Sequence, residues 1–203
     1  MKIIAISSPD HCPQEAAWIE RLLDAGLARY HVRKPGWSAD ELELFLGSIP
    51  ESCRGRILLH QHHALVSEWA LGGWHFKDDP QGDFISVDPS LLRSDGPILS
   101  RSLHRIDDLE TDIRSWDAVL LSPIFPSISK PGHQPRWEGA KLVRKIAALG
   151  SGVRAELFAL GGVHADNAAQ CRAMGFDGVV LHGVLWQSED PIKAFEAVKE
   201  VLR

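Results

Sequence analysis

Two hydroxyls and an ammonium follow one of the most apolar runs of this 203-residue chain. In the stretch LLSPIFPSISKPG, residues 120–132, Ser127, Ser129 and Lys130 come just after the apolar run. Alternate residues of an extended segment share one side, so the Ser127 and Ser129 hydroxyls can face one anionic group, and the long Lys130 side chain can reach the same group. A lysine ammonium is a mobile point charge suited to phosphate oxygens. The stretch therefore predicts a phosphate-binding loop, and a solvated loop with an incidental lysine is the plainer alternative.

A glycine pair gives a second phosphate signal. Gly161 and Gly162 follow an apolar run in ALGGVHADN, and a later run, VVLHGV, reaches His182 and Gly183. Glycines let the backbone turn tightly and present amide hydrogens to a phosphate. A tight connection without any ligand would use the same residues, so the pair is informative mainly because Gly183 follows the next run.

A third candidate is the cation pair Arg33–Lys34, which closes the segment ARYHVRK. An arginine guanidinium can bind phosphate through two parallel N–H groups, and Lys34 adds charge beside it. Adjacent cations are common on solvated surfaces. Their place at the end of an apolar segment favours a ligand instead.

These residues follow short apolar segments that alternate with amphipathic ones. We expect strands over 2–7, 28–34, 56–60, 73–76, 97–102, 117–124, 154–162 and 176–183. We expect helices over 14–26, 38–49, 63–72, 105–115, 138–150, 164–175 and 191–202, with a brief helix at most in 77–96. Ser38 and Glu41 have the spacing of a capping box. Strict alternation without a linker predicts a parallel sheet, and eight pairs predict an α/β fold, a single-domain (β/α)8 TIM barrel over residues 1–203. A doubly wound sheet is the alternative.

Histidines also gather at the expected strand ends, where such barrels build their active sites. They include His60, His62, His63 and His75, and imidazole suits zinc. Contact with a ligand, acid–base work and plain structural roles are the alternatives to a metal site.

The composition limits the partners. With 44% hydrophobic and 24% charged residues the chain is typical of a globular protein, and its net charge of −5 without a basic block argues against nucleic acid. Membrane association is not expected, because no apolar run approaches the roughly 20 residues of a spanning helix. The N-terminus lacks the pattern of a signal peptide, and three cysteines without CxxC spacing predict reduced thiols, so we expect a cytoplasmic protein. A homo-oligomer stays open.

Six motifs resemble the family of thiamine phosphate synthases and related thiazole tautomerases. They are HVRKPG, GWHFKDD, SRSLH, DAVLLSPIFPSISKPG, ALGGV and GFDGVVLHGVL. The segment SPIFPSISK, where the family has GPIFPT-x-TK, is the most diagnostic. The resemblance implies a (β/α)8 barrel and a transferase that joins hydroxymethylpyrimidine pyrophosphate to thiazole phosphate, releasing pyrophosphate, with Mg²⁺. The expected partners are small phosphorylated heterocycles.

The resemblance also implies roles for individual residues. Arg33, Ser102 and Lys130 would hold the pyrophosphate, with His104 in the same catalytic group. Ser127, Gly162 and the backbone at His182 and Gly183 would hold the thiazole phosphate. Further substrate contacts are expected from Lys34, His60, Gln61, Ser129 and Gly161, and Mg²⁺ ligands from Asp78 and Asp79.

Several positions depart from the family pattern. An Asn-Asp pair is replaced by His60 and Gln61, a second Asp by Pro80, a Lys by Pro35 and a Gln by His31, while Pro123 stands where the tautomerases have a histidine. Three alternatives remain open. They are a synthase, a tautomerase-type isomerase that uses His31, His60, His75 or His104 as base, and a non-catalytic binder of thiazole phosphate or thiamine phosphate.

Overall fold

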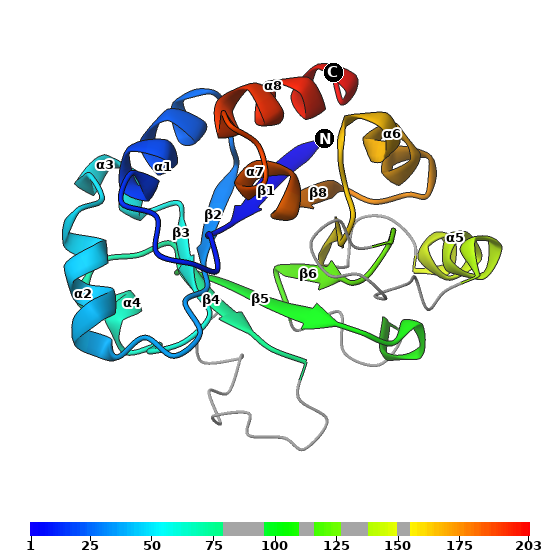
Figure 1. Cartoon of the computed structure of the whole chain (residues 1–203). Helices are drawn as coiled ribbons and strands as arrows, with labels where there is room; N and C mark the ends of the chain where they lie inside the picture. The colour runs from blue at the N-terminus through cyan, green and yellow to red at the C-terminus, as the bar shows by residue number, and fades with distance from the viewer. Residues whose placement is uncertain (79–95, 110–115, 127–137, 150–154) are drawn as a thin grey trace.

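Eight parallel strands close into a barrel in sequence order (Figure 1). The structure is a computed structural model that describes residues 1–78, 96–109, 116–126, 138–149 and 155–203. The strands are β1 (Lys2–Ile6), β2 (Arg29–Val32), β3 (Ile57–Leu59), β4 (Gly73–Phe76), β5 (Ile98–Leu103), β6 (Ala118–Leu121), β7 (Glu156–Leu160) and β8 (Gly178–Leu181). The ring closes where β1 pairs with β8, from Lys2 opposite Gly178 to Ala5 opposite Leu181. The predicted (β/α)8 fold is confirmed.

Helices surround the outside of the barrel, as Figure 1 shows. They are α1 (Glu15–Asp24), α2 (Ala39–Gly47), α3 (Glu51–Arg54), α4 (Leu65–Glu68), α5 (Gly139–Ala148), α6 (Ala165–Ala173), α7 (Gly183–Trp186) and α8 (Pro191–Val201). The capping box at α2 is confirmed, because the Ser38 hydroxyl accepts from the Glu41 amide and the Glu41 carboxylate accepts from the Ser38 amide. Within the described ranges, no helix has the length and apolar character needed to cross a membrane.

The short helices differ in length or number from those expected from the sequence. α4 has four residues rather than the expected ten-residue segment, and after β5 the described chain forms a 3-10 turn over Ile106–Leu109. α3 and α7 are single turns that the sequence did not predict, since one turn is too short to show a helical period. The brief helix expected within 77–96 lies almost entirely outside the described residues, and so do residues 110–115 of the helix expected over 105–115.

Side chains alternate between two cores. Outward residues such as Tyr30, Val32 and Leu59 pack beneath the helices in one large apolar cluster. Inward residues fill the barrel, and six of them form a separate apolar cluster from β1, β6, β7 and β8, namely Ile4, Ile6, Ala118, Leu120, Phe158 and Val180. The interior therefore has an apolar half.

The other half of the interior is polar. It comes from β2 to β5 and contains His31, His60, His75, Ser100 and Ser102, whose ring and hydroxyl groups contact one another. The three imidazoles are almost completely buried. Buried polar groups need partners inside the protein, so these strands depend on one another's side chains.

Candidate active site

A cavity of about 420 Å³ opens at the carboxyl ends of the strands, a size suited to a small molecule. Every strand, or the loop that follows it, contributes to the wall. The lining residues are Ile6, Arg33, His60, His75, Lys77, Asp78, Ser102, His104, Ser122, Pro123, Leu160, Gly161, Gly162, Val163, Val180, His182 and Gly183.

The cavity wall continues the two halves of the barrel interior. Ile6, Leu160 and Val180 give it an apolar side that comes from β1, β7 and β8. Arg33 and Lys77 bring positive charge from the loops after β2 and β4. This wall suits a ligand that carries an apolar ring together with anionic groups.

The Ser7 hydroxyl holds the backbone of Arg33 in place. The Ser7 hydroxyl, just after β1, donates to the Arg33 carbonyl at 2.9 Å and accepts from the Arg33 amide at 2.8 Å. Both backbone groups of Arg33 are thereby tied to the neighbouring strand end. The guanidinium starts from a fixed point, which limits the entropy that it loses on binding an anion.

The glycine pair after β7 is required by a close backbone approach. Gly161 and Gly162 have φ of +97° and +66°, and a Cβ at Gly162 would lie 2.2 Å from the Pro126 carbonyl oxygen. The Phe125 amide donates to the Gly161 carbonyl at 3.1 Å. The loop after β6 therefore rests on the glycine loop, and it leads directly to Ser127.

A third cluster joins the loops after β4, β5 and β6. The Asp78 carboxylate accepts from the His104 amide at 2.8 Å and lies 3.5 Å from the Arg101 guanidinium. His104 Nδ1 lies 3.0 Å from the Ser122 carbonyl, which can only accept, so that nitrogen carries the proton. A neutral His104 ring then has its lone pair on Nε2.

This donor set does not fit Mg²⁺. The ion prefers octahedral oxygen ligands that include carboxylates. Among the described residues that line the cavity, Asp78 is the only carboxylate, and both its oxygens already have partners. Asp79 lies outside the described residues, and the role predicted for both aspartates stays a prediction.

Three histidines meet at the floor of the cavity. His31 Nδ1 lies 3.1 Å from His60 Nε2, and the His60 and His75 rings stack with centroids 3.9 Å apart. Burial, with a smaller effect of Arg29, lowers the pKa of His31 from 6.5 to about 3. Burial likewise lowers the pKa of His60 and His75 well below 6.5, and neighbouring histidines add to the effect. All three imidazoles are therefore neutral at pH 7.

The histidines considered for a zinc site in the sequence are His60, His62, His63 and His75, whereas the structure groups His31 with His60 and His75. The exposed His62 contacts the Trp37 carbonyl at 2.8 Å through Nε2, and His63 Nε2 contacts the His75 carbonyl at 3.2 Å. Neither joins the cluster, because both sit in the turn that precedes α4 rather than on a strand. His31 takes their place, since its side chain points inward from β2.

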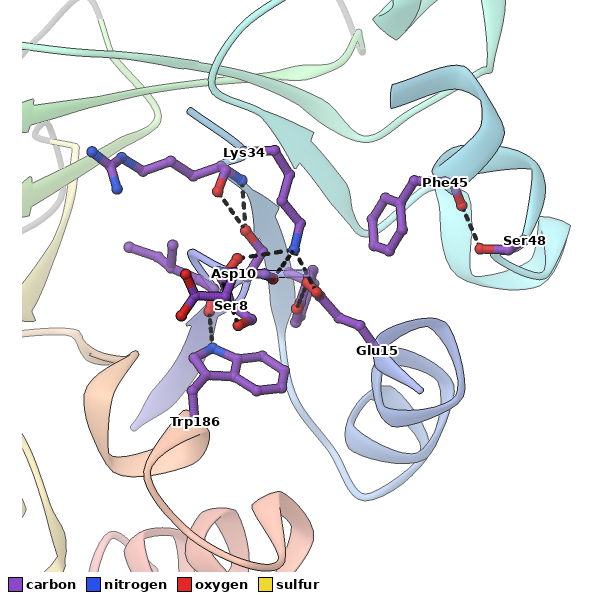
Figure 2. A network of polar contacts seen from close by, with 11 residues as sticks. Ser8, Asp10, Glu15, Lys34, Phe45, Ser48 and Trp186 are labelled. Atoms are coloured by element: carbon purple, nitrogen blue, oxygen red, sulfur yellow. Dashed lines mark hydrogen bonds and ion pairs between the residues drawn. The ribbon is translucent and has the colours of Figure 1, made fainter. Parts of the chain in front are cut away.

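Lys34 lies outside the cavity lining. Its ammonium contacts the carbonyls of Ser8 and Asp10 and forms a salt bridge with Glu15 at 2.5 Å (Figure 2). Tyr30 donates to the second oxygen of the same carboxylate at 2.7 Å. Burial raises the pKa of Glu15, whereas the Lys34 ammonium lowers it. Both charged side chains are about 1% exposed or less, so Lys34 ties the loop after β1 to α1.

The remaining predicted site residues divide into three groups. The structure brings to the cavity Arg33, His60, Asp78, Ser102, His104, Gly161, Gly162, His182 and Gly183. Gln61, like Lys34, is not in the lining, and its amide nitrogen donates to the Lys34 carbonyl. Outside the described residues are Asp79, Ser127, Ser129 and Lys130.

Two polar lining residues, Lys77 and Ser122, were not assigned a role from the sequence. Lys77 is an exposed cation directly after β4, and Ser122 follows β6. The sequence signal that could have identified them is their position just after a strand. Many other polar residues share that position, so the signal does not single them out.

Known proteins with similar sequences share one description. A family model described as thiamine monophosphate synthase matches residues 3–184. The thiamine-phosphate synthase of Listeria innocua is 31% identical over 183 residues, which cover 85% of this chain and 82% of that protein. The one from Bacillus velezensis is 22% identical over 192 residues, covering 91% and 83%.

Solved structures agree with the sequence matches. The crystal structure of thiamine phosphate pyrophosphorylase from Bacteroides thetaiotaomicron superposes with a TM-score of 0.81 at 26% identity. The superposition covers 100% of this chain and 98% of that one. The superposition thus includes all eight strands.

The buried pair of Lys34 and Glu15 makes a testable contribution to stability. Replacing Glu15 by Gln leaves a buried ammonium without its counter-charge, and we expect a loss of about 3–5 kcal/mol in the free energy of unfolding. The double variant Lys34→Met, Glu15→Gln removes both charges and should be more stable than Glu15→Gln alone. Urea unfolding measures both, and equal stability of the single and double variants would contradict a buried ion pair.

The neutral histidines predict that stability falls in acid. Their pKa values are lower in the folded state, so the unfolded state binds more protons below pH 6.5, and the free energy of unfolding decreases as the pH falls. Three such groups give a slope of up to roughly 4 kcal/mol per pH unit. Glu15, whose pKa is raised, acts in the opposite direction but is a single group.

Urea titrations of the chelator-treated protein between pH 7 and pH 5 measure this slope. We expect His31→Gln to reduce it by roughly a third, because one of the three groups is removed. Equal stability of the unmodified chain at both pH values would show that the imidazoles can become charged without unfolding.

Proposed function

The chain belongs to the thiamine monophosphate synthase family, and we propose that it is a transferase that couples hydroxymethylpyrimidine pyrophosphate with thiazole phosphate. The products are thiamine phosphate and pyrophosphate. The bond between the pyrimidine methylene carbon and the pyrophosphate oxygen breaks, and the thiazole nitrogen forms the new bond to that carbon. The oxygen keeps the electron pair of the broken bond, and no proton needs to move.

The main support for the proposal is that cations and glycine loops lie on opposite sides of one cavity. In the closed order of eight strands, β3 lies across the barrel from β7. Arg33 and Lys77 stand on the β2–β4 side, and the glycine loops after β7 and β8 stand on the other. Two phosphorylated molecules can therefore bind with their charged groups apart and their rings meeting in the middle.

On the β2–β4 side, the residues can stabilise the leaving group. Arg33 can donate two parallel hydrogen bonds to pyrophosphate oxygens, and the Ser102 hydroxyl can donate another. Lys130, for which the family resemblance implies a role here, would add a further positive charge. Neutralising the negative charge that develops on pyrophosphate is the main catalytic task, and fixed cations in a cavity perform it without reorganisation.

On the opposite side, the backbone can hold the thiazole phosphate. The positive φ of Gly161 and Gly162 turns this loop tightly against the loop after β6. Backbone amides in such a turn can donate hydrogen bonds to a phosphate. The apolar residues Ile6, Leu160 and Val180 would cover the rings and keep water from the reactive carbon. Water there would hydrolyse the pyrimidine pyrophosphate instead of allowing coupling.

The family resemblance implies Mg²⁺ as well. The described residues do not form a magnesium site, so we assign charge neutralisation to the protein cations. Dependence on Mg²⁺ is then a question for the activity assay.

The deciding experiment is a coupled assay with the purified chain. Hydroxymethylpyrimidine pyrophosphate and thiazole phosphate are supplied with and without Mg²⁺, and we expect thiamine phosphate to form. Failure to form product, with thiazole phosphate still bound in calorimetry, would favour the non-catalytic binder. Isomerisation of the thiazole alone would favour the tautomerase-type activity, with His104 Nε2 as a candidate base.

Lys130 gives a prediction specific to the anion site. Replacing Lys130 by Ala should weaken pyrophosphate binding by about 1.5–3 kcal/mol, roughly ten- to hundredfold, because a charged hydrogen bond is lost. Lys193→Ala, which removes an exposed cation from α8, serves as the charge-matched control and should bind normally. Calorimetry with pyrophosphate measures both, and unchanged affinity in Lys130→Ala would remove this residue from the site.

A further inference from the structure

We propose that His31, His60 and His75 form a binding site for a transition-metal ion of the Zn²⁺ type at the floor of the cavity. This inference stands on the geometry of the barrel interior and does not depend on the coupling reaction. The site differs from the oxygen-rich magnesium site that the family resemblance implies, because its donors are nitrogen atoms. Imidazole suits zinc and its neighbours in the periodic table, whereas Mg²⁺ prefers oxygen.

The spacing of the three rings supports the proposal. Each histidine offers one ring nitrogen, and these nitrogens lie within 4.8 Å of one another. Zinc–nitrogen bonds of about 2.0–2.1 Å in a tetrahedral arrangement would place ligand nitrogens roughly 3.4 Å apart. The 3.1 Å between His31 Nδ1 and His60 Nε2 is already close to this value.

The protonation of His75 is fixed in the form that a metal needs. The Ser100 hydroxyl donates its single proton to the Trp74 carbonyl at 3.1 Å, so its oxygen must accept from His75 Nδ1 at 2.9 Å. A neutral His75 ring then has its lone pair on Nε2, which faces the Ser102 hydroxyl at 2.9 Å. Metal-binding histidines commonly have their second N–H held in this way by a neighbouring group.

His31 carries the second indication. Its Nε2 atom is buried and has no hydrogen-bond partner among the described residues. The contact between His31 Nδ1 and His60 leaves Nε2 without a partner, whichever ring donates the proton. If His31 donates, Nε2 retains an unused lone pair, and if His60 donates, Nε2 carries an unused proton. Buried polar atoms in proteins nearly always have a partner, so the three rings are incomplete as an internal hydrogen-bond network.

The protonation of the three imidazoles, the charge of Arg33 and the opening to the cavity all affect metal binding at this site. The imidazoles are neutral in the folded protein, so protons do not compete for their lone pairs near pH 7. Arg33 is close enough to lower the pKa of His60 and His75, and its charge opposes any cation. Because His60 and His75 line the cavity, a fourth coordination position would face a bound ligand.

Zinc binding to the full chain, after removal of metals with a chelator, tests the proposal. Calorimetry with Zn²⁺ should give a single equivalent bound to the unmodified protein. His31→Gln, His60→Gln and His75→Gln should each weaken binding by at least the roughly 10–100-fold that losing even an outer partner costs. His62→Asn is the matched control, because it removes a neighbouring exposed histidine and should bind as the unmodified chain does.

X-ray absorption at the zinc edge provides a readout that needs no variant. The loaded protein should show three imidazole nitrogens at about 2.0–2.1 Å. No stoichiometric binding, sulfur ligands from a cysteine, or affinity unchanged in all three histidine variants would each overturn the proposal. Because these readouts are binding and coordination, they can fail while the coupling assay succeeds, and the reverse also holds.

Discussion

Closure of the eight-stranded ring is the constraint on which the rest of this molecule depends. Once β1 pairs with β8, every second side chain of every strand faces one shared interior, and no strand has a free edge. The interior must then be filled by what those strands carry. In this chain β1, β6, β7 and β8 supply apolar side chains, whereas β2 to β5 supply imidazoles and hydroxyls. The division of the barrel into two halves follows directly from the sequence of the strands.

The same division shapes the cavity above it. The apolar half continues upward as the wall that can cover two heterocycles, and the polar half continues as the wall that bears Arg33 and Lys77. The pleat decides which of two adjacent cations belongs to this wall. Arg33 faces the cavity, and Lys34 faces outward, where Glu15 neutralises it. Two neighbouring positive charges thus serve different purposes, one for a ligand and one for the loop after β1.

The histidines connect the proposed reaction with the proposed metal site. At His31 and His60 the family pattern has amide side chains, and their replacement by imidazoles changes the floor of the cavity from oxygen donors to nitrogen donors. Asp78 meanwhile is bound by His104 and Arg101. The contacts of Asp78 leave fewer oxygen ligands for magnesium, and the imidazoles supply nitrogen ligands for a softer ion. Neither feature involves Gly161, Gly162 or Arg33, the residues proposed to bind phosphate.

The sequence by itself determined the architecture and the rim that holds the site. Alternating segments predicted the barrel, and parallel strands bring their carboxyl ends together, so Arg33, Ser102 and the glycine loops could be placed in advance. It could not tell that His31, rather than His62 or His63, joins His60 and His75. That depends on register, because His31 lies opposite Leu58 and Leu58 opposite Gly73, which stacks three inward positions of neighbouring strands. Register and pleat are set by the closing of the whole sheet, and no local pattern of residues contains them.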